Sequence, residues 1–308
     1  MGDIHKVVVI GAGAMGAYFA SRFYEAPGFS TSFLAKGERQ EKLQKNGLVI
    51  NGDSYHIPAV DPQQIDSPAD LVIVALKHHH LADTIPDMKN LIGPDTTIIS
   101  VMNGLESEEM IGAVYGMDKI LYTISVGIDA VREGSRINYT KPGTHYFGEA
   151  KNPSITPKVR RVQAAFDQAG IKWETPPDMV RMLWWKFMIN VGMNQASAVT
   201  GAPYGIFHTD PDAQGLMEAL MQEVITLAGA SNVNLTDQDI HDWYKFLNML
   251  SPQGKTSMLQ DVEAKRKTEI EIFGGKVVRL GKALGIPTPV NLTVSRIILL
   301  LEQQYLSD

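Results

Sequence analysis

The sequence predicts two domains, an α/β domain with a mostly parallel sheet covered by helices on both faces, followed by an all-α domain. The chain has 308 residues, which is more than one hydrophobic core usually organises. Short apolar strands alternate with helical segments up to about residue 150, and beyond it apolar residues recur with helical spacing. We therefore place the two domains at residues 1–155 and 156–308.

The composition argues against several classes of function. A formal net charge of -6 and a pI near 5.8 give no support for binding to nucleic acid or to an anionic membrane surface. The chain has no cysteine, which excludes disulfides, thiolate metal sites and cysteine nucleophiles. The apolar run 297–301 is too short to cross a bilayer, and the N-terminus lacks the features of a signal peptide. We expect a cytoplasmic protein without nucleic-acid or membrane partners.

Glycines at G-x-G-x-x-G spacing directly follow the first predicted strand, 6–10. Gly11 allows a tight turn, Gly13 lets a pyrophosphate approach the backbone, and Gly16 lets the next helix pack closely on the strand. The N-terminus of that helix offers free N–H groups to an anion. This arrangement predicts a Rossmann dinucleotide-binding domain, with cofactor contacts at Gly11, Ala12, Gly13, Ala14, Met15 and Gly16.

The end of the second predicted strand, 30–35, selects between NAD and NADP. An NAD site usually carries Asp or Glu there, whereas Lys36 comes first in this chain and Arg39 follows on a short polar helix. Glu38 lies between these cations and favours NAD. The two cations favour NADPH as the cofactor.

Two further strands, 70–77 and 96–102, end on polar residues. Lys77 and Asn103 lie at these carboxyl ends, which is where open parallel sheets bind ligands. The run His78–His80 does not indicate a metal site, because adjacent side chains point in different directions and metal ligands usually come from separate elements. We expect no bound metal.

The remaining elements follow from turn and cap signals. A hairpin is predicted at Asn51-Gly52, and a second one within 135–149 that turns at Pro142-Gly143. In the second half, Asp210 and Thr236 are predicted helix N-caps. The other predicted elements are helices 105–116, 158–169, 178–194, 211–230, 236–247, 257–285 and 289–306, and strands 119–126 and 171–173.

The helix containing LWWKFMINVGMN, residues 183–194, carries Lys186, Asn190 and Asn194 four residues apart. Each such step turns about 40° and rises about 6 Å, so the three polar side chains form one stripe on an otherwise apolar helix. Burying such groups unpaired costs several kcal/mol, so the stripe either joins a core network or faces a ligand. Gly192 costs about 1 kcal/mol relative to alanine, which suggests a close approach to a neighbouring helix.

Glu269 lies on the apolar line of the predicted helix 257–285. A carboxylate in that position needs a cation. Arg266 and Lys267 can provide a surface ion pair, and Lys186 is the functional alternative.

These residues resemble the ketopantoate reductase (2-dehydropantoate 2-reductase) family, whose members join an N-terminal Rossmann domain to a C-terminal helical domain. The resemblance covers nearly the whole chain. It is carried by GAGAMG at 11–16, LK at 76–77, NG at 103–104, LWWKFMINVGMN at 183–194, and SMLQD followed by TEI within 257–270.

The resemblance implies roles for the polar residues of the second half. Lys186 would be the general acid for the ketone, and Glu269 would orient Lys186 and the substrate. Asn190 and Asn194 would bind the substrate's hydroxyl and nearby oxygens, and Ser257 would bind its carboxylate.

In the first half, the resemblance implies that Lys77 and Asn103 contact the ribose and nicotinamide side of the cofactor. Asn103 also belongs to the predicted substrate set. Two positions depart from the family pattern: Met102 stands where many members have Gln, and Lys36 replaces the commoner Arg that meets the 2′-phosphate. Lys36 keeps the charge but loses the bidentate fork of arginine.

The reaction implied by the resemblance is NADPH-dependent reduction of ketopantoate to pantoate, a step toward pantothenate and coenzyme A, in the cleft between the domains. Two alternatives stay open. One is a related NAD(P)-dependent reductase of another small 2-oxo acid, and the other is a non-catalytic NADPH-binding regulatory protein. A homodimer is a further expectation.

Overall fold

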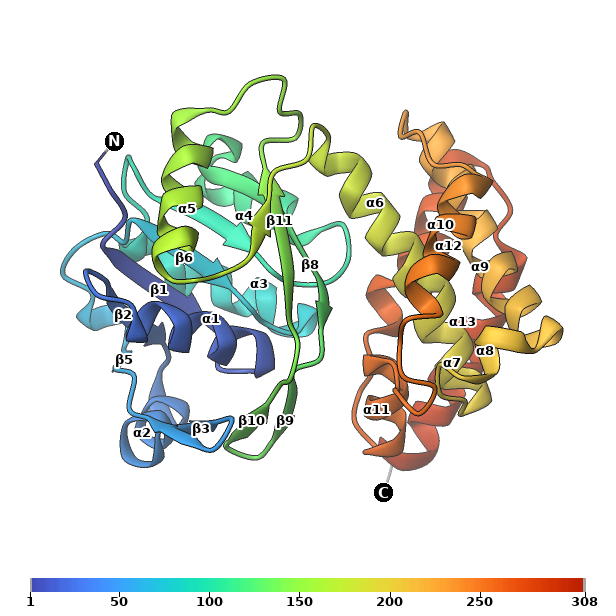
Figure 1. Ribbon diagram of the computed structural model, residues 1–308, viewed down its shortest axis with the longest axis horizontal. Coiled ribbons are helices and arrows are strands. Elements are labelled where there is room, and N and C mark those ends of the chain that lie inside the picture. Colours follow the sequence, from blue (N-terminus) through green and yellow to red (C-terminus); the bar gives the residue numbers. More distant parts are fainter. Residues whose placement is uncertain (1, 307–308) are drawn as a thin grey trace. The chain divides into compact units, whose positions relative to one another are not determined.

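The computed structural model describes residues 2–306 and divides into two compact units, Met1–Val180 and Arg181–Asp308. The first unit is a sheet with helices and the second is helical (Figure 1). The division falls after Val180, whereas the sequence predicted a boundary between residues 155 and 156. Residues 156–180 join the first unit because their strand pairs with the edge of its sheet.

The first unit is built on an eight-stranded sheet with the order β12-β11-β8-β7-β6-β1-β2-β5. Neighbouring strands are parallel except for β8 and β11, as the predicted Rossmann arrangement requires. The strands are β1 Lys6–Ile10, β2 Ser30–Leu34, β5 Ala59–Val60, β6 Leu71–Val74, β7 Thr97–Ser100, β8 Ile120–Ile128, β11 Pro142–Gly148 and β12 Trp173–Glu174.

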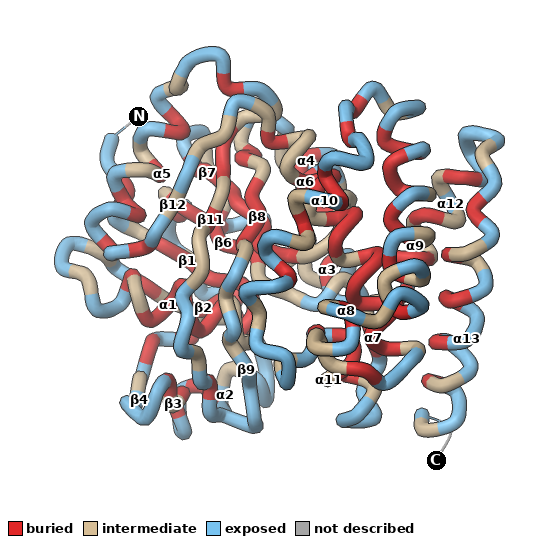
Figure 2. Tube along the Cα trace, turned by 45° about the vertical axis from the view of Figure 1, so that its right-hand side comes forward, coloured by how far each residue is buried: buried red, intermediate tan, exposed pale blue. Residues whose placement is uncertain are grey.

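Both faces of this sheet are covered, which explains its continuously apolar central strands. Val7 and Val9 of β1 join a core with α1 (Ala14–Glu25) and α5 (Pro157–Gln168), while Val8 and Ile10 join a second core on the opposite face. Figure 2 shows the central strands as buried. The second face is covered by α3 (Leu81–Thr84), η3 (Ile85–Leu91) and α4 (Ser107–Tyr115), which follow the short turn η2 (His78–His80). The other helical segments are α2 Gly37–Asn46, η1 Pro62–Gln64 and η4 Met117–Lys119.

A smaller sheet of order β4-β3-β10-β9 lies in the first unit. The predicted hairpin at Asn51-Gly52 is confirmed, because β3 (Leu48–Ile50) pairs antiparallel with β4 (Asp53–Tyr55). The predicted turn at Pro142-Gly143 is wrong. The hairpin of β9 (Val131–Glu133) and β10 (Arg136–Asn138) turns instead at Gly134, whose φ of 62° suits glycine, and β11 pairs with β8.

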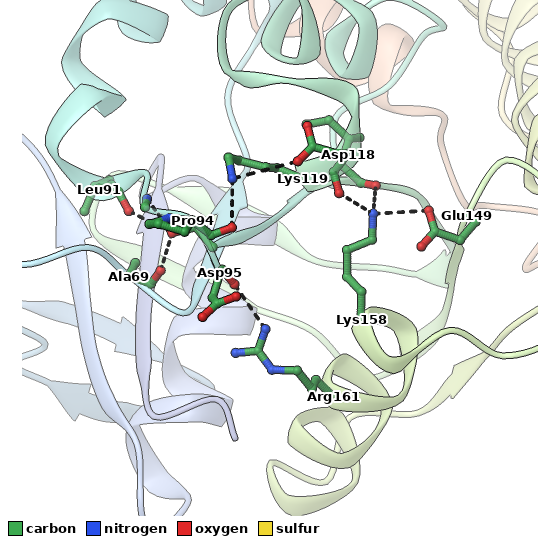
Figure 3. Close-up of polar contacts among 12 residues, drawn as sticks. Ala69, Leu91, Pro94, Asp95, Asp118, Lys119, Glu149, Lys158 and Arg161 are labelled. Atoms are coloured by element: carbon green, nitrogen blue, oxygen red, sulfur yellow. Dashed lines mark hydrogen bonds and ion pairs between the residues drawn. The ribbon is translucent and has the colours of Figure 1, made fainter. Parts of the chain in front are cut away.

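Basic side chains fix helix α5 and its surroundings at the amino ends of β7 and β8 (Figure 3). Lys158 is buried, and its Nζ donates to two backbone carbonyls, one of them Asp118 O at 2.7 Å, and pairs with Glu149 at 3.2 Å. Arg161 Nη1 donates to Asp95 O at 3.1 Å. These basic groups at the amino edge of the sheet therefore have structural partners within the protein.

The second unit consists of helices, and the predicted caps are present. Asp210 accepts a hydrogen bond from Ala213 N at 2.9 Å, and Thr236 forms a capping box with Asp239. Within residues 2–306 no helix is both long and apolar enough to span a bilayer. The elements are α6 Met179–Ile189, η5 Asn190–Asn194, α7 Gln195–Thr200, α8 Ile206–Thr209, α9 Pro211–Ala230, α10 Asp237–Leu247, α11 Ser257–Glu263, η6 Ile270–Ile272, α12 Gly274–Leu284 and α13 Pro289–Leu306.

Two helices predicted as continuous are interrupted. Helix α6 passes into η5, one π-helical turn, before α7 resumes regular geometry. The predicted helix 257–285 is wrong in its middle, because α11 ends at Glu263 and α12 begins only at Gly274. Lys265 adopts a left-handed φ of 53°, and Arg266 N donates back to Asp261 O at 2.8 Å, which closes the end of α11 without the usual glycine.

Candidate active site

Four strands of the large sheet present their carboxyl ends side by side, in the order β7-β6-β1-β2. Asn103, Lys77, Gly11 and Lys36 follow these strands in the same order. The chain leaves β1 for β2 on one side and later forms β6 on the other, so the gap between β1 and β6 is a topological switch point. Ligands of open parallel sheets bind at such points. The structure therefore gathers the predicted cofactor contacts of the first unit at one edge.

The glycine loop has the shape that a dinucleotide needs. Gly11 has a φ of 105°, and a Cβ added to it would lie 2.3 Å from Ala75 O. A Cβ at Gly16 would lie 1.7 Å from Gly11 O, whereas one at Gly13 would meet no heavy atom of the described chain within 4 Å. Gly11 and Gly16 are thus required by the protein itself. The open space at Gly13 and the N-terminus of α1 fit a bound pyrophosphate.

A cavity of about 190 Å³ adjoins Gly11 and the end of β2. Among the residues that line it, Lys36 and Arg39 are positively charged, and Asp83 and Asp87 are negatively charged. Lys36 Nζ lies 2.6 Å from Asp87 Oδ2, and the hydrogen bond and charge of Asp87 raise the pKa of Lys36. The cation predicted to meet a 2′-phosphate therefore already has a carboxylate partner.

Asp83 and Asp87 were not predicted from the sequence, because no element was predicted for the segment that follows Lys77. This segment forms η2, α3 and η3. The available signal was the four-residue spacing of the two aspartates, which helical turns bring to one side.

In the second unit, the helical stretch 183–194 is enclosed as predicted. Every residue in it is buried except Lys186 and Asn190, which are half-buried. Asn194 is 7 % exposed and ends the π-helical turn. Because a π turn is wider than an α turn, Asn194 does not continue the α-helical stripe as predicted. Lys186 and Asn190 are therefore the two partly exposed polar residues of an otherwise buried helical stretch.

The π turn η5 is held by its neighbours, α9 and α11. A Cβ at Gly192 would lie 2.4 Å from Met221 Cγ of α9, which confirms the predicted close approach to a neighbouring helix. Gln195 is fully buried, and its Nε2 donates to Val191 O at 2.8 Å and to Asn291 Oδ1 at 2.8 Å. These contacts fix the backbone that presents the two asparagines.

Of the other two predicted residues of the second unit, one lies at the start of the predicted helix 257–285 and the other lies in the break between α11 and α12. Ser257 is exposed at the start of α11, which packs against η5 and α7. Glu269 is half-buried in the turn before η6, so the predicted helical register of Glu269 is wrong. Its neighbour Thr268 donates its N–H to Glu302 Oε1 of α13 at 2.7 Å, which anchors the turn.

Within residues 2–306, no group of three or more His, Cys, Asp or Glu side chains is arranged to hold a metal ion. The three consecutive histidines form the short turn η2. His78 Nε2 lies 3.8 Å from Glu106 Oε2.

Both halves of the chain match a known family. Residues 7–152 match the family described as ketopantoate reductase PanE/ApbA, and residues 178–302 match its C-terminal part, described as ketopantoate reductase PanE/ApbA C terminal. The chain belongs to the ketopantoate reductase family. As a ketopantoate reductase family member it is an oxidoreductase, and the family uses a nicotinamide dinucleotide.

Relatives of this ketopantoate reductase family member include proteins at 19–25% identity. A 2-dehydropantoate 2-reductase of Streptococcus pyogenes serotype M3 is 25% identical over 287 residues, which cover 92% of this chain and 93% of that protein. A D-mandelate dehydrogenase solved with NADH and anilino(oxo)acetate has a TM-score of 0.87 at 20% identity, covering 97% and 99% of the two chains. A dimeric ketopantoate reductase from Staphylococcus aureus has a TM-score of 0.81 at 19% identity, with the same coverage. The two solved structures support the fold.

Proposed function

We propose that the protein catalyses the NADPH-dependent reduction of ketopantoate to pantoate, a step toward pantothenate and coenzyme A. The observation that carries this proposal is the pair of half-buried polar positions, Lys186 and Asn190, on a helical stretch that is otherwise buried. Partial burial of the Lys186 ammonium costs desolvation free energy that an apolar residue there would not, which favours a chemical role for this lysine. The glycine loop of the first unit fits the dinucleotide that such a reaction requires.

When bound, a reduced nicotinamide dinucleotide would provide the hydride that the ketone carbon accepts. Negative charge then grows on the ketone oxygen, and Lys186 Nζ donates a proton to that oxygen. The ketone carbon thus gains a C–H bond and its oxygen gains an O–H bond, while Lys186 recovers its proton from solvent. Glu269 orients the Lys186 ammonium.

The remaining predicted residues bind the substrate in this proposal. Asn190 and Asn194 hold the oxygen that becomes the hydroxyl and its neighbouring oxygens, and the Ser257 hydroxyl donates to the carboxylate. Lys77 and Asn103 contact the ribose and nicotinamide side of the cofactor, and Asn103 also contacts substrate. The position of Ser257 at the start of α11, which packs against η5, supports its grouping with the two asparagines.

NADPH is proposed as the preferred donor because Lys36 and Arg39 line the cavity beyond β2. We also propose a cytoplasmic enzyme, which fits a chain without cysteine, and a homodimer, which fits the dimeric Staphylococcus aureus relative.

The test is an NADPH absorbance assay with ketopantoate, pyruvate, 2-oxoisovalerate and benzoylformate. We expect the highest kcat/KM with ketopantoate. Lys186→Ala should lower kcat by at least about a hundredfold and leave NADP⁺ affinity unchanged, because the lysine acts on the ketone rather than on the dinucleotide. The matched control is Lys245→Ala, which removes an exposed lysine of α10 paired with Asp242 and should leave kcat unchanged.

The panel separates the alternatives. Preference for benzoylformate would assign the chain to another 2-oxo acid, an arm included because the fold resembles D-mandelate dehydrogenase. Absence of NADPH oxidation with every substrate would favour a non-catalytic dinucleotide-binding protein. Full turnover by the Lys186→Ala variant would refute the assigned acid.

A further inference from the structure

The hairpin β9–β10 brings an arginine to the glycine loop from far along the chain. Arg132 Nη1 donates to Ala12 O at 2.5 Å, across a separation of 120 residues. Its Nε donates to Gly134 O at 2.7 Å within the turn of the hairpin. A guanidinium has five N–H donors in a rigid fork, so three of them are left for other acceptors at this loop.

A second guanidinium lies near the first. Arg39 lines the cavity that adjoins Gly11. Burial, and then the positive charge of Arg39, lower the pKa of Arg132, which means that the two like charges act on each other. No carboxylate within residues 2–306 forms an ion pair with Arg132 or Arg39. Two arginines that repel each other beside a glycine loop form an arrangement that a bound anion stabilises.

The cations and carboxylates that line the cavity are balanced in number. Lys36 and Arg39 are matched by Asp83 and Asp87, and Lys36 is held by Asp87 at 2.6 Å. Asp61 adds a further negative charge near Lys36. The residues that line the cavity therefore offer no excess positive charge to a phosphate. Arg132 does not line the cavity, but its guanidinium contacts Ala12 next to Gly11 and interacts with the charge of Arg39, so it adds positive charge beside the cavity.

We propose that Arg132 is a cofactor-binding residue that, together with Arg39, holds the 2′-phosphate of NADPH. This inference rests on the proposed NADPH dependence. It assigns the decisive positive charge to the hairpin rather than to Lys36. The pyrophosphate of the cofactor offers the same chemistry, but NAD⁺ and NADP⁺ share it, so a comparison of the two dinucleotides separates the two sources.

The experiment measures equilibrium binding of NADP⁺ and NAD⁺ to the full chain by isothermal titration calorimetry. We expect Arg132→Gln to raise the Kd for NADP⁺ by at least about tenfold and the Kd for NAD⁺ by less than about threefold. The matched control is Arg136→Gln, which removes an exposed arginine on the other strand of the same hairpin. It should change both Kd values by less than about twofold.

The second variant is Arg39→Gln, which changes an exposed helical residue and should show the same selective loss without affecting folding. An equal loss of NADP⁺ and NAD⁺ affinity in Arg132→Gln would overturn the proposal, since it indicates pyrophosphate contact or support of the loop. The proposal would also be overturned if neither arginine variant lost NADP⁺ affinity, or if Arg136→Gln lost as much of it as Arg132→Gln. A wild-type protein that binds both dinucleotides equally would overturn it as well. Because binding is measured without turnover, a protein that reduces no 2-oxo acid still gives a decisive result. If the protein is an active reductase and Arg132→Gln leaves its NADP⁺ affinity unchanged, the role of Arg132 is refuted while the proposed function stands.

Discussion

Gly192→Ala tests whether the backbone of η5 needs its close approach to α9. The added Cβ would lie 2.4 Å from Met221 Cγ, 2.8 Å from Met221 Cε and 2.9 Å from Met217 O. Overpacking of this kind costs about 1–3 kcal/mol, and the higher helix propensity of alanine returns up to about 1 kcal/mol. Because Met221 is fully buried and one of the contacts is backbone, we expect a net destabilisation of about 1–2 kcal/mol.

The assay is urea denaturation of the full chain. With a slope of about 3 kcal/mol per molar urea, the expected loss lowers the midpoint by roughly 0.5 M. Gly215→Ala is the matched control, because Gly215 is exposed on α9 and a Cβ there would meet no described atom within 4 Å. That control should gain about 0.5–1 kcal/mol from helix propensity alone.

The two glycine variants should therefore move the midpoint in opposite directions. A Gly192→Ala variant as stable as the wild type, beside a stabilised Gly215→Ala, would refute the close-approach argument. A double-mutant cycle with Met221→Ala adds a second check. Removal of the Met221 side chain should relieve part of the overlap, so the two losses should sum to more than the loss of the double variant.

Three further predictions concern charged groups. Asp87→Asn should tighten NADP⁺ binding up to about tenfold at low salt and leave NAD⁺ binding unchanged, because it removes a negative charge beside Lys36; weaker NADP⁺ binding by calorimetry would contradict this. Burial would raise the pKa of Asp129, but hydrogen bonds from Thr140 and Lys141 outweigh burial and lower the pKa of this carboxyl. The stabilisation from the Asp129 carboxylate is therefore present above the unfolded pKa of about 3.9 and is lost as pH falls through the folded pKa. Asp129→Asn should flatten this part of the acid dependence of the urea midpoint, and an unchanged profile would count against it. Lys158→Ala should lower the free energy of unfolding by about 3 kcal/mol because it leaves Glu149 and two carbonyls without their cation. The double variant Lys158→Met with Glu149→Leu should lower it by less in the same urea assay.

The sequence was sufficient for the parts of the fold that rest on repeated apolar patterns. The central strands β1 and β6 are buried on both faces, so they appear as continuous apolar runs. The caps of α9 and α10 have their own side-chain signatures. The glycine loop was predictable because Gly11 and Gly16 are each fixed by a steric demand that no other residue meets.

Backbone features without a residue signature were not predictable. Helix α11 ends in a left-handed residue that is lysine rather than glycine, so the apolar pattern continued through the break. The π turn of η5 contains no proline and follows the same apolar spacing as α6. The hairpin β9–β10 is short, and two of its three β9 residues are charged, so no alternation marked it.

These failures fall on the residues proposed to act on ligands. Asn190 is the first residue of the π turn and Asn194 is its last. Glu269 lies in the non-helical turn after α11. On a regular helix, side chains that face the core stabilise the packing when they are apolar, and their spacing makes the helix predictable. Lys186 lies on the regular helix α6, whereas Asn190, Asn194 and Glu269 lie where the backbone departs from this pattern. The departures are supported by buried contacts of their own, Gln195 to Val191 under the π turn and Thr268 to Glu302 beside Glu269. Such contacts stabilise the irregular backbone within the fold. The side chains of Asn190, Asn194 and Glu269 are not needed for that stabilisation, which is consistent with a role in binding a ligand.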